Sequence, residues 1–307
     1  MPIRSSCRAA VRKPSWQSVS GVNLAHPFYF DHPLDHVPGI MLIVELLGLV
    51  RQVVKQGEPQ LAVHNIHDIP ADPGWLRTSL SFPRFGELDA ETELRAWPSL
   101  RPGQWTFVAG QTHFPACVGT VSFLRSAPLA ARGPVPAYRS APSPQPMPGY
   151  LVHRRRPENI LIGEAGREEA GPTRCAVLSP GSDDHLFTVL GGPERTPEEL
   201  IEAARQAAVM LWSHAFGWPA DVRLTLNSVS ADLPVSVDRS VPLELRWWPH
   251  EIKGNKARTS FELVAGSDAP ELIGSIGICT QAWSESQWQR IRSAQRREAE
   301  AAGEGPC

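Results

Sequence analysis

The segment His26–Gln52, HPFYFDHPLDHVPGIMLIVELLGLVRQ, contains the pattern that decides the fold. Histidines and aspartates form a loop, a Pro-Gly turn follows, and an apolar run then surrounds one carboxylate, Glu45. A second segment, Asp183–Trp212, reads DDHLFTVLGGPERTPEELIEAARQAAVMLW and repeats this order. An unpaired carboxylate on an apolar helix is costly to bury. Finding the costly pattern twice predicts an internal duplication with a shared site.

Both segments predict a long helix. The run Ile40–Leu49 is apolar on nearly every side, which is typical of a buried helix. In the second segment, apolar residues recur at spacings of three and four and form one stripe: Leu200, Ile201, Ala204, Ala208 and Leu211. Runs rich in β-branched and aromatic residues follow each helix. This order predicts an α+β fold in which an antiparallel sheet wraps around each helix.

Composition divides the chain into five segments. The polar, basic stretch 1–20 is predicted to be a disordered leader, and the globular domains are expected at 21–126 and 150–283. The prolines of 127–149 cannot continue a helix or a central strand, so this stretch is expected to be an extended linker. The charged, alanine-rich tail 284–307 is predicted to be a solvated helix that frays into disorder.

Several function classes are disfavoured by composition. The net charge of −2 gives no support to nucleic-acid binding, which usually requires a basic excess. The longest apolar run, Ile40–Val50, is too short to span a bilayer, and the basic N-terminus lacks the apolar stretch of a secretory signal. The scattered cysteines show no zinc-ligand spacing, and no nucleotide-binding motif is present. We therefore expect a cytoplasmic protein without metal or cofactor and without membrane attachment.

The loop of domain 1 supplies the first candidate site residues. His32 and His36 precede a turn that ends at Gly39, and Glu45 lies on the helix. A histidine and a carboxylate so arranged suit general acid/base catalysis, with Asp35 and Gly39 expected to contact the substrate. Alternatively, the two histidines only cap the helix or hydrogen-bond to its first turn.

In domain 2 the helix supplies Glu202 and Arg205, whose spacing of three residues places both on one face. Their apolar flanks favour a half-buried pair in which Arg205 holds a phosphate or carboxylate. The alternative is an ordinary surface ion pair. The basic segment that opens the domain adds anion-binding candidates, His153, Arg154 and Arg156, unless it is simply a solvated charge run.

The run FDHPLDHVPGIMLIVELL resembles the DHVPGMLLLEAARQA motif of the A-factor (gamma-butyrolactone autoregulator) synthase family. The runs LVHRRRPENILIG and EELIEAARQAAVMLW resemble the VHR-x-R-P-E and E-A-x-R-Q-A motifs of that family's other half. Together these similarities cover roughly residues 22–124 and 150–283. The resemblance implies a tandem hotdog fold, in which each long helix is wrapped by an antiparallel sheet.

The chain departs from the family pattern in three ways. The two halves are in exchanged order, and the polar residues before His26 provide no clear first strand. The family has Glu five residues after the loop glycine and Arg three further on, whereas here Val44 is fifth, Glu45 is sixth, and Gly48 lies three beyond it. One residue rotates a helix position by about 100°. The Glu/Arg pair is therefore intact only in domain 2.

By resemblance, the chain transfers a β-ketoacyl group from an acyl-carrier-protein thioester to dihydroxyacetone phosphate, toward a butyrolactone signal. Arg205 then binds the phosphate or polarises the thioester carbonyl. Glu202 orients Arg205 or acts as base, and His36 with Glu45 forms a second site, active or vestigial. Two alternatives remain open: a hotdog dehydratase or thioesterase acting on carrier-bound acyl chains, and a non-catalytic acyl-binding paralogue. The two sheets are expected to join as an internal pseudo-dimer, and homodimerisation remains open.

Overall fold

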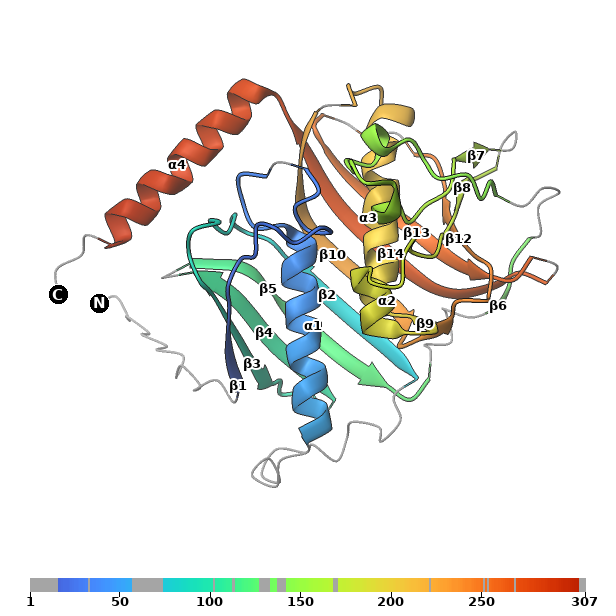
Figure 1. Ribbon diagram of the computed structural model, residues 1–307, viewed down its shortest axis with the longest axis horizontal. Coiled ribbons are helices and arrows are strands. Elements are labelled where there is room, and N and C mark those ends of the chain that lie inside the picture. The colour runs from blue at the N-terminus through green and yellow to red at the C-terminus, as the bar shows by residue number, and fades with distance from the viewer. Residues whose placement is uncertain are drawn as a thin grey trace, which may run out of the picture.

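Two copies of one helix-and-sheet unit make up the structure, a computed structural model (Figure 1). The described residues are 16–32, 34–56, 74–101, 103–111, 114–126, 133–136, 142–167, 171–220, 222–250, 252, 254–267 and 269–303. Both units contribute to one 12-stranded antiparallel sheet. Within these ranges, no helix is both long enough and apolar enough to cross a membrane.

The first unit places one long helix, α1 (Gly39–Gln56), against five strands. The strand order across the sheet is β1-β3-β4-β5-β2. These strands are β1 (Trp16–Ser20), β2 (Trp75–Ser81), β3 (Thr92–Pro98), β4 (Gln104–Gln111) and β5 (Phe114–Leu124).

The second unit repeats this arrangement around α3 (Pro197–His214). Its strand order, read outward from the junction, is β10-β14-β13-β12-β8, which mirrors the order of the first unit. These strands are β8 (Thr173–Ala176), β10 (Arg223–Pro234), β12 (Leu243–Trp247), β13 (Lys256–Ala265) and β14 (Glu271–Trp283). The shorter elements are β6 (Gly133–Pro134), β7 (Gly166–Arg167), α2 (Leu186–Gly191), β9 (Glu194–Arg195), β11 (Val237–Asp238) and the 3-10 turns Gly149–Leu151 and Pro157–Asn159. The prediction of an α+β fold with a sheet around each long helix is confirmed.

The start of α3 follows from local capping. The Thr196 side chain accepts a hydrogen bond from the Glu199 backbone N–H, and Pro197 occupies the first turn, where its missing N–H costs nothing. Glu198 and Glu199 place negative charge at the positive end of the helix dipole. The resulting helix is buried along most of its length.

The units meet through β2 and β10, which pair antiparallel with Leu80 opposite Val229. The helices α1 and α3 lie side by side on the same face of the sheet (Figure 1). Arg51 of α1 joins them by donating both terminal nitrogens to the buried Glu198 of α3, with Nη2 2.5 Å from Oε2. One large apolar cluster runs through both units, and a small second cluster surrounds Trp212.

Two predictions at the chain ends are corrected. Trp16–Ser20 is not part of a disordered leader but forms β1, which pairs with β3 as an edge strand. Trp16 packs against Trp105, with ring centroids 5.0 Å apart, so domain 1 does have a first strand. Residues 1–15 lie outside the described part of the chain.

The tail is a helix, α4 (Glu285–Gly303), but it is not solvated on all sides. Trp288 and Arg292 are only 2% and 3% exposed. Two parts of the expected linker, 127–132 and 137–141, lie outside the described residues. Its described parts are ordered, since β6 pairs with β14 and Met147 is buried.

Candidate functional site

A cavity of about 710 Å³ lies where the loop of domain 1 meets α3 of domain 2. Its volume is suited to a small-molecule ligand. Most of the predicted site residues line it: His32, Asp35, His36, Gly39, His153, Arg154 and Arg205. Apolar side chains complete the wall and can accommodate an acyl chain: Leu34, Ile40, Val209, Val222, Leu224 and Leu226. The structure therefore brings residues of both units into one cavity.

Glu202 of α3 is a buried carboxylate that holds the arginines of this site in place. The side chain is fully buried and accepts four hydrogen bonds, from Arg154 Nη2 (2.5 Å), Arg205 Nε (2.7 Å), Arg205 Nη2 (2.8 Å) and Gln206 Nε2 (2.9 Å). Burial alone raises the pKa of Glu202, but the Arg205 and Arg154 guanidinium groups outweigh it and lower the pKa to about 2. Such a carboxylate is a poor base, so its geometry supports orientation of Arg205.

Arg205 presents the positive charge of the site to the cavity. Its Nε and Nη2 are held by Glu202, whereas its Nη1 makes no hydrogen bond within the described residues. Burial lowers the pKa of Arg205, but the adjoining Glu202 raises it by more. The net effect raises the pKa, so the guanidinium stays charged. A fixed guanidinium with one free edge can bind a carbonyl oxygen, an oxyanion or a phosphate.

Arg154 fastens the loop of domain 1 to domain 2. Its Nη1 donates to the Phe28 carbonyl (2.7 Å) and to Asp31 Oδ1 (3.3 Å), while its Nη2 binds Glu202. Asn159 Nδ2 donates to the other Asp31 oxygen (3.1 Å). The predicted substrate-binding role of Arg154 is therefore only partly supported. It lines the cavity, but its charge is committed to two buried carboxylates.

Two histidines that line the same cavity, His32 and His36, each pair with the aspartate that precedes them in the sequence. His32 Nδ1 lies 2.7 Å from Asp31 Oδ1, and His36 Nδ1 lies 2.8 Å from Asp35 Oδ1. An ionised carboxylate only accepts hydrogen bonds, so each Nδ1 carries a proton and each neutral ring keeps a free lone pair on Nε2. His36 is the main cause of the lowered pKa of Asp35. These contacts contradict a purely capping role for the histidines.

His26, by contrast, has a local structural role. Its Nδ1 accepts hydrogen bonds from the backbone N–H groups of Phe28 (3.2 Å) and Tyr29 (3.4 Å). In domain 2, His185 caps α2 in the same way, with Nδ1 3.2 Å from the Phe187 N–H. His185 therefore has a structural role at the start of α2.

His153 lies in the cavity with a left-handed backbone, at φ 53°. This conformation is unfavourable for a residue other than glycine, and its presence at a cavity suggests a functional constraint. Its Nε2 donates to the Ala220 carbonyl (3.0 Å), which leaves Nδ1 as an acceptor. Burial lowers the pKa of His153 to about 4, so the ring is neutral at physiological pH.

Glu45 is not among the described residues that line the cavity. Because α1 begins at Gly39, the positions that match Glu202 and Arg205 are Val44 and Leu47. The His36–Glu45 pair stays a prediction: no hydrogen bond or ion pair joins the two side chains within the described residues. Arg156 is exposed and also lies outside the cavity wall.

Several residues of the cavity were not predicted from the sequence. Tyr29, Tyr150, Arg155, Arg223 and Trp288 all line it. Trp288 had a visible signal, because it is the one aromatic residue of a highly charged helix. The others required knowledge of how distant segments meet.

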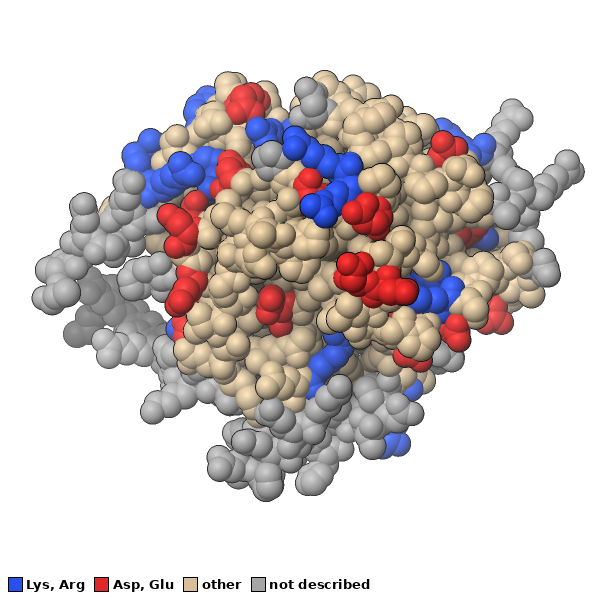
Figure 2. Space-filling model, viewed as in Figure 1, with Lys and Arg blue, Asp and Glu red and all other residues tan. Residues whose placement is uncertain are grey.

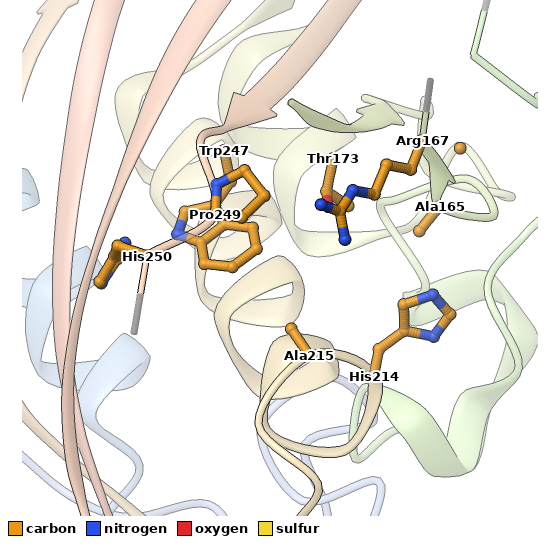
Figure 3. A pocket seen from close by; sticks show the side chains of 9 residues that line it. Ala165, Arg167, Thr173, His214, Ala215, Trp247, Pro249 and His250 are labelled. Atoms are coloured by element: carbon orange, nitrogen blue, oxygen red, sulfur yellow. The ribbon is translucent and has the colours of Figure 1, made fainter. Parts of the chain in front are cut away.

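A second cavity, of about 430 Å³, lies near the end of α3 (Figure 3). Arg167, His214, Trp247 and His250 contribute to its wall, and none of the predicted site residues does. Within the described residues, no ion pair joins its arginine or histidines to an acid. Neither do the described residues contain a cluster of three metal-binding side chains. The larger cavity is therefore the candidate active site.

Burial also excludes two of the cysteines as nucleophiles. It raises the pKa of the Cys117 thiol, and it raises that of Cys175 to about 12. Both residues are buried in the apolar core.

Comparison with known proteins identifies the family. The model of the A-factor biosynthesis hotdog domain matches residues 12–112 and 137–265. No curated protein sequence matches the chain. These two matched segments include both long helices and most strands of the two units.

Solved structures show the same double fold. The dehydratase domain from the CurJ module of curacin polyketide synthase has a TM-score of 0.55 and 13% identity, over 88% of this chain and 92% of that one. The tesB protein of Mycobacterium avium subs paratuberculosis has a TM-score of 0.55 and 14% identity, over 89% and 95%. The PpsC dehydratase domain of Mycobacterium tuberculosis has a TM-score of 0.55 and 12% identity, over 88% and 93%. At such identities the similarity shows the fold alone, whereas the family model covers most of the sequence: the chain belongs to the A-factor biosynthesis hotdog domain family.

Proposed function

We propose that the protein is an acyltransferase that moves a β-ketoacyl group from an acyl-carrier-protein thioester to a hydroxyl of dihydroxyacetone phosphate. One observation carries the proposal: Arg205, fixed by the buried Glu202, faces a cavity lined by two histidines that each pair with an aspartate. The positive charge and the bases come from different units. Family membership supports the choice of substrates.

The reaction requires a base, an oxyanion partner and a leaving thiolate. In our proposal, Nε2 of His36 or His32 accepts the proton of the attacking hydroxyl. The hydroxyl oxygen bonds to the thioester carbonyl carbon, and Arg205 stabilises the oxyanion that forms. Collapse of this intermediate breaks the carbon–sulfur bond, and the thiolate takes the proton from the imidazolium. No covalent enzyme intermediate is needed.

Other arginines can provide the phosphate and carrier contacts. Arg155 and Arg223 line the cavity, so the phosphate can bind them while Arg205 contacts the carbonyl. Arg156 is exposed on the same segment as Arg155. On the face shown in Figure 2, Lys and Arg side chains gather over α4 and between α4 and α3. Such a surface suits the phosphate of a carrier-bound chain and an acidic carrier protein.

A dehydratase is less well supported by this geometry. A second acid/base group on the helix would have to be Glu202, and its oxygens are already occupied by Arg154, Arg205 and Gln206. A thioesterase needs only an activated water, so it remains the closest competing activity. A butyrolactone signal as the final product belongs to the proposal, as does location in the cytoplasm, where such substrates are made.

Mass spectrometry of the products tests the proposal. The purified chain is incubated with a β-ketoacyl carrier-protein thioester, with and without dihydroxyacetone phosphate. We expect a phosphorylated β-ketoacyl ester that forms only when both substrates are present. Release of free β-ketoacid at the same rate in both mixtures identifies a thioesterase. Binding of the acyl chain without any turnover identifies a non-catalytic acyl-binding protein.

A further inference from the structure

The C-terminal helix α4 lies beyond the segments that match the family model, yet it contacts the loop that carries His36. Trp288 Nε1 donates to Asp35 Oδ2 (3.0 Å), and Arg292 Nη2 donates to the Asp35 backbone carbonyl (2.7 Å). The other carboxylate oxygen of Asp35 binds His36 Nδ1 (2.8 Å). A continuous chain of contacts therefore runs from α4 to the histidine of the cavity.

The side chains around His36 also come in part from α4. The ring of His36 lies 4.9 Å from that of Phe85 and 5.6 Å from that of Trp288, measured between centroids. Phe85 and Trp288 are in edge-to-face contact at 4.9 Å. These rings restrict the rotation of the imidazole, while Asp35 selects which ring nitrogen holds the proton.

Arg292 is buried, and its ion pairs must offset the cost of desolvating its charge. Its Nη1 and Nη2 donate to the two carboxylate oxygens of Glu87, at 2.9 and 2.8 Å. Its guanidinium carbon lies 5.3 Å from the Phe85 ring centroid. Arg292 thus joins α4, the Phe85–Glu87 segment and the loop at one point.

The two histidine–aspartate pairs differ in what supports them. Asp31, the partner of His32, is held by Arg154 and Asn159 of domain 2. Asp35, the partner of His36, is held by Trp288 and Arg292 of α4. A helix added after the second unit therefore supports one of the two pairs specifically.

We propose that Trp288 and Arg292 are positioning residues that hold Asp35 so that His36 keeps its proton on Nδ1 and presents Nε2 to the cavity as the base. This inference deepens the proposed acyl transfer and rests on it for its catalytic meaning. The proposal has two parts. The positional part, that α4 fixes the tautomer of His36, can be measured without any substrate; the catalytic part, that this tautomer acts as the base, requires the reaction.

Nitrogen NMR of the full chain labelled with ¹⁵N tests the positional part, with His36→Asn used to assign the His36 signals. In the neutral wild-type ring we expect Nδ1 to be protonated and Nε2 to be unprotonated. Trp288→Phe keeps the aromatic packing but loses the N–H donor, and Arg292→Met keeps most of the aliphatic stem but loses the charge. Both variants should give a mixture of the two tautomers. Arg297→Met removes the same charge from an exposed position of α4 and should leave the wild-type spectrum.

Steady-state kinetics test the catalytic part. Trp288→Phe and Arg292→Met should lower kcat by about tenfold, with KM for the thioester changed less than about twofold, because a misplaced base slows proton transfer without affecting binding. Arg297→Met should retain the wild-type kcat. An unchanged His36 tautomer in both variants would overturn the proposal, as would an unchanged kcat. If the wild type shows no acyl transfer, the proposed function fails while the tautomer alone decides whether α4 positions His36.

Discussion

The helices α1 and α3 occupy matching places in the two units, but only α3 carries a glutamate–arginine pair at the positions that match between them. At the matching positions, α3 carries Glu202 and Arg205, while α1 carries Val44 and Leu47. In the segments directly before the two helices, it is domain 1 and not domain 2 that carries polar side chains of the cavity. The loop of domain 1 carries two histidine–aspartate pairs, whereas His185 of domain 2 only caps a short helix.

This difference shows how a duplicated fold can assign separate tasks to its copies. Two identical units facing each other across α1 and α3 would build two equivalent sites. Here one site combines the loop of the first unit with the helix of the second, and the opposite combination lacks the polar residues. Both units are therefore needed to form the sheet and the cavity, but the residues proposed for the chemistry meet in only one cavity.

The largest expected effect comes from making the same substitution on the two helices. Glu202→Gln leaves the buried Arg154 and Arg205 without their shared carboxylate and should lower the free energy of unfolding by about 3–5 kcal/mol. Glu45→Gln, on α1, should change it by less than about 0.5 kcal/mol, since Glu45 is not part of such a network. Urea denaturation monitored by tryptophan fluorescence measures both. Equal losses would show that the two helices are energetically equivalent.

Catalysis should distinguish the arginines of the two helices. Arg205→Lys keeps the charge but not the paired geometry, and Arg205→Ala removes both, so we expect kcat/KM to fall by about 10²–10³-fold in the alanine variant and less in the lysine variant. Arg51→Lys is the matched control on α1, because Arg51 pairs with Glu198 outside the cavity. It should stay within about threefold of the wild type. A comparable loss in Arg51→Lys would assign the chemistry to the α1–α3 contact instead.

Stability should depend on pH through two histidines of domain 2, His153 and His185. Burial lowers the pKa values of His153 and His185 to about 4, below the ordinary histidine value of 6.5. The unfolded chain then binds protons that the folded chain does not, so stability is full above pH 6.5 and falls as the pH drops toward about 4. Glu202, with its pKa lowered to about 2, adds a further loss from about pH 4.5 downward.

Thermal unfolding at a series of pH values measures this dependence. In His153→Asn the fall between pH 6.5 and 4 should be shallower than in the wild type. His214→Asn, at an exposed position of domain 2, is the control and should retain the wild-type slope. A slope that is unchanged in His153→Asn would mean that this ring titrates normally in the folded protein.

The spacing of apolar residues predicted the helices and the fold class, because this spacing shows which face of a helix or strand is buried. The apolar residues of the two long helices, and the β-branched runs after them, are set by short-range spacing, so the α+β architecture followed from the sequence. β1 was missed because Trp16–Ser20 is an edge strand with only two apolar residues, and its pairing partner β3 lies far along the chain. The buried face of α4 was missed for a similar reason, since Trp288 meets a loop more than 200 residues away.

The candidate site was predictable where its residues are close in sequence. Glu202 and Arg205 share one helical face, so their ion pair follows from spacing alone. The role of Arg154 does not, because it depends on the meeting of the domain 1 loop with α3. The expected partnership of His36 and Glu45 assumed that neighbouring segments of sequence form a site within one unit, and no hydrogen bond joins the two side chains within the described residues.

The smallest expected effect is also the most direct test of the division of tasks. Glu45→Gln should leave kcat/KM for acyl transfer within about twofold of the wild type, because Glu45 does not line the cavity. His36→Gln, nine residues earlier, should reduce it at least tenfold, by removing a base whose contribution is commonly about 10²–10⁴-fold. Parallel rate measurements at saturating dihydroxyacetone phosphate separate the two positions. A marked loss in Glu45→Gln would mean that α1 takes part in the reaction, and that the two helices share the chemistry after all.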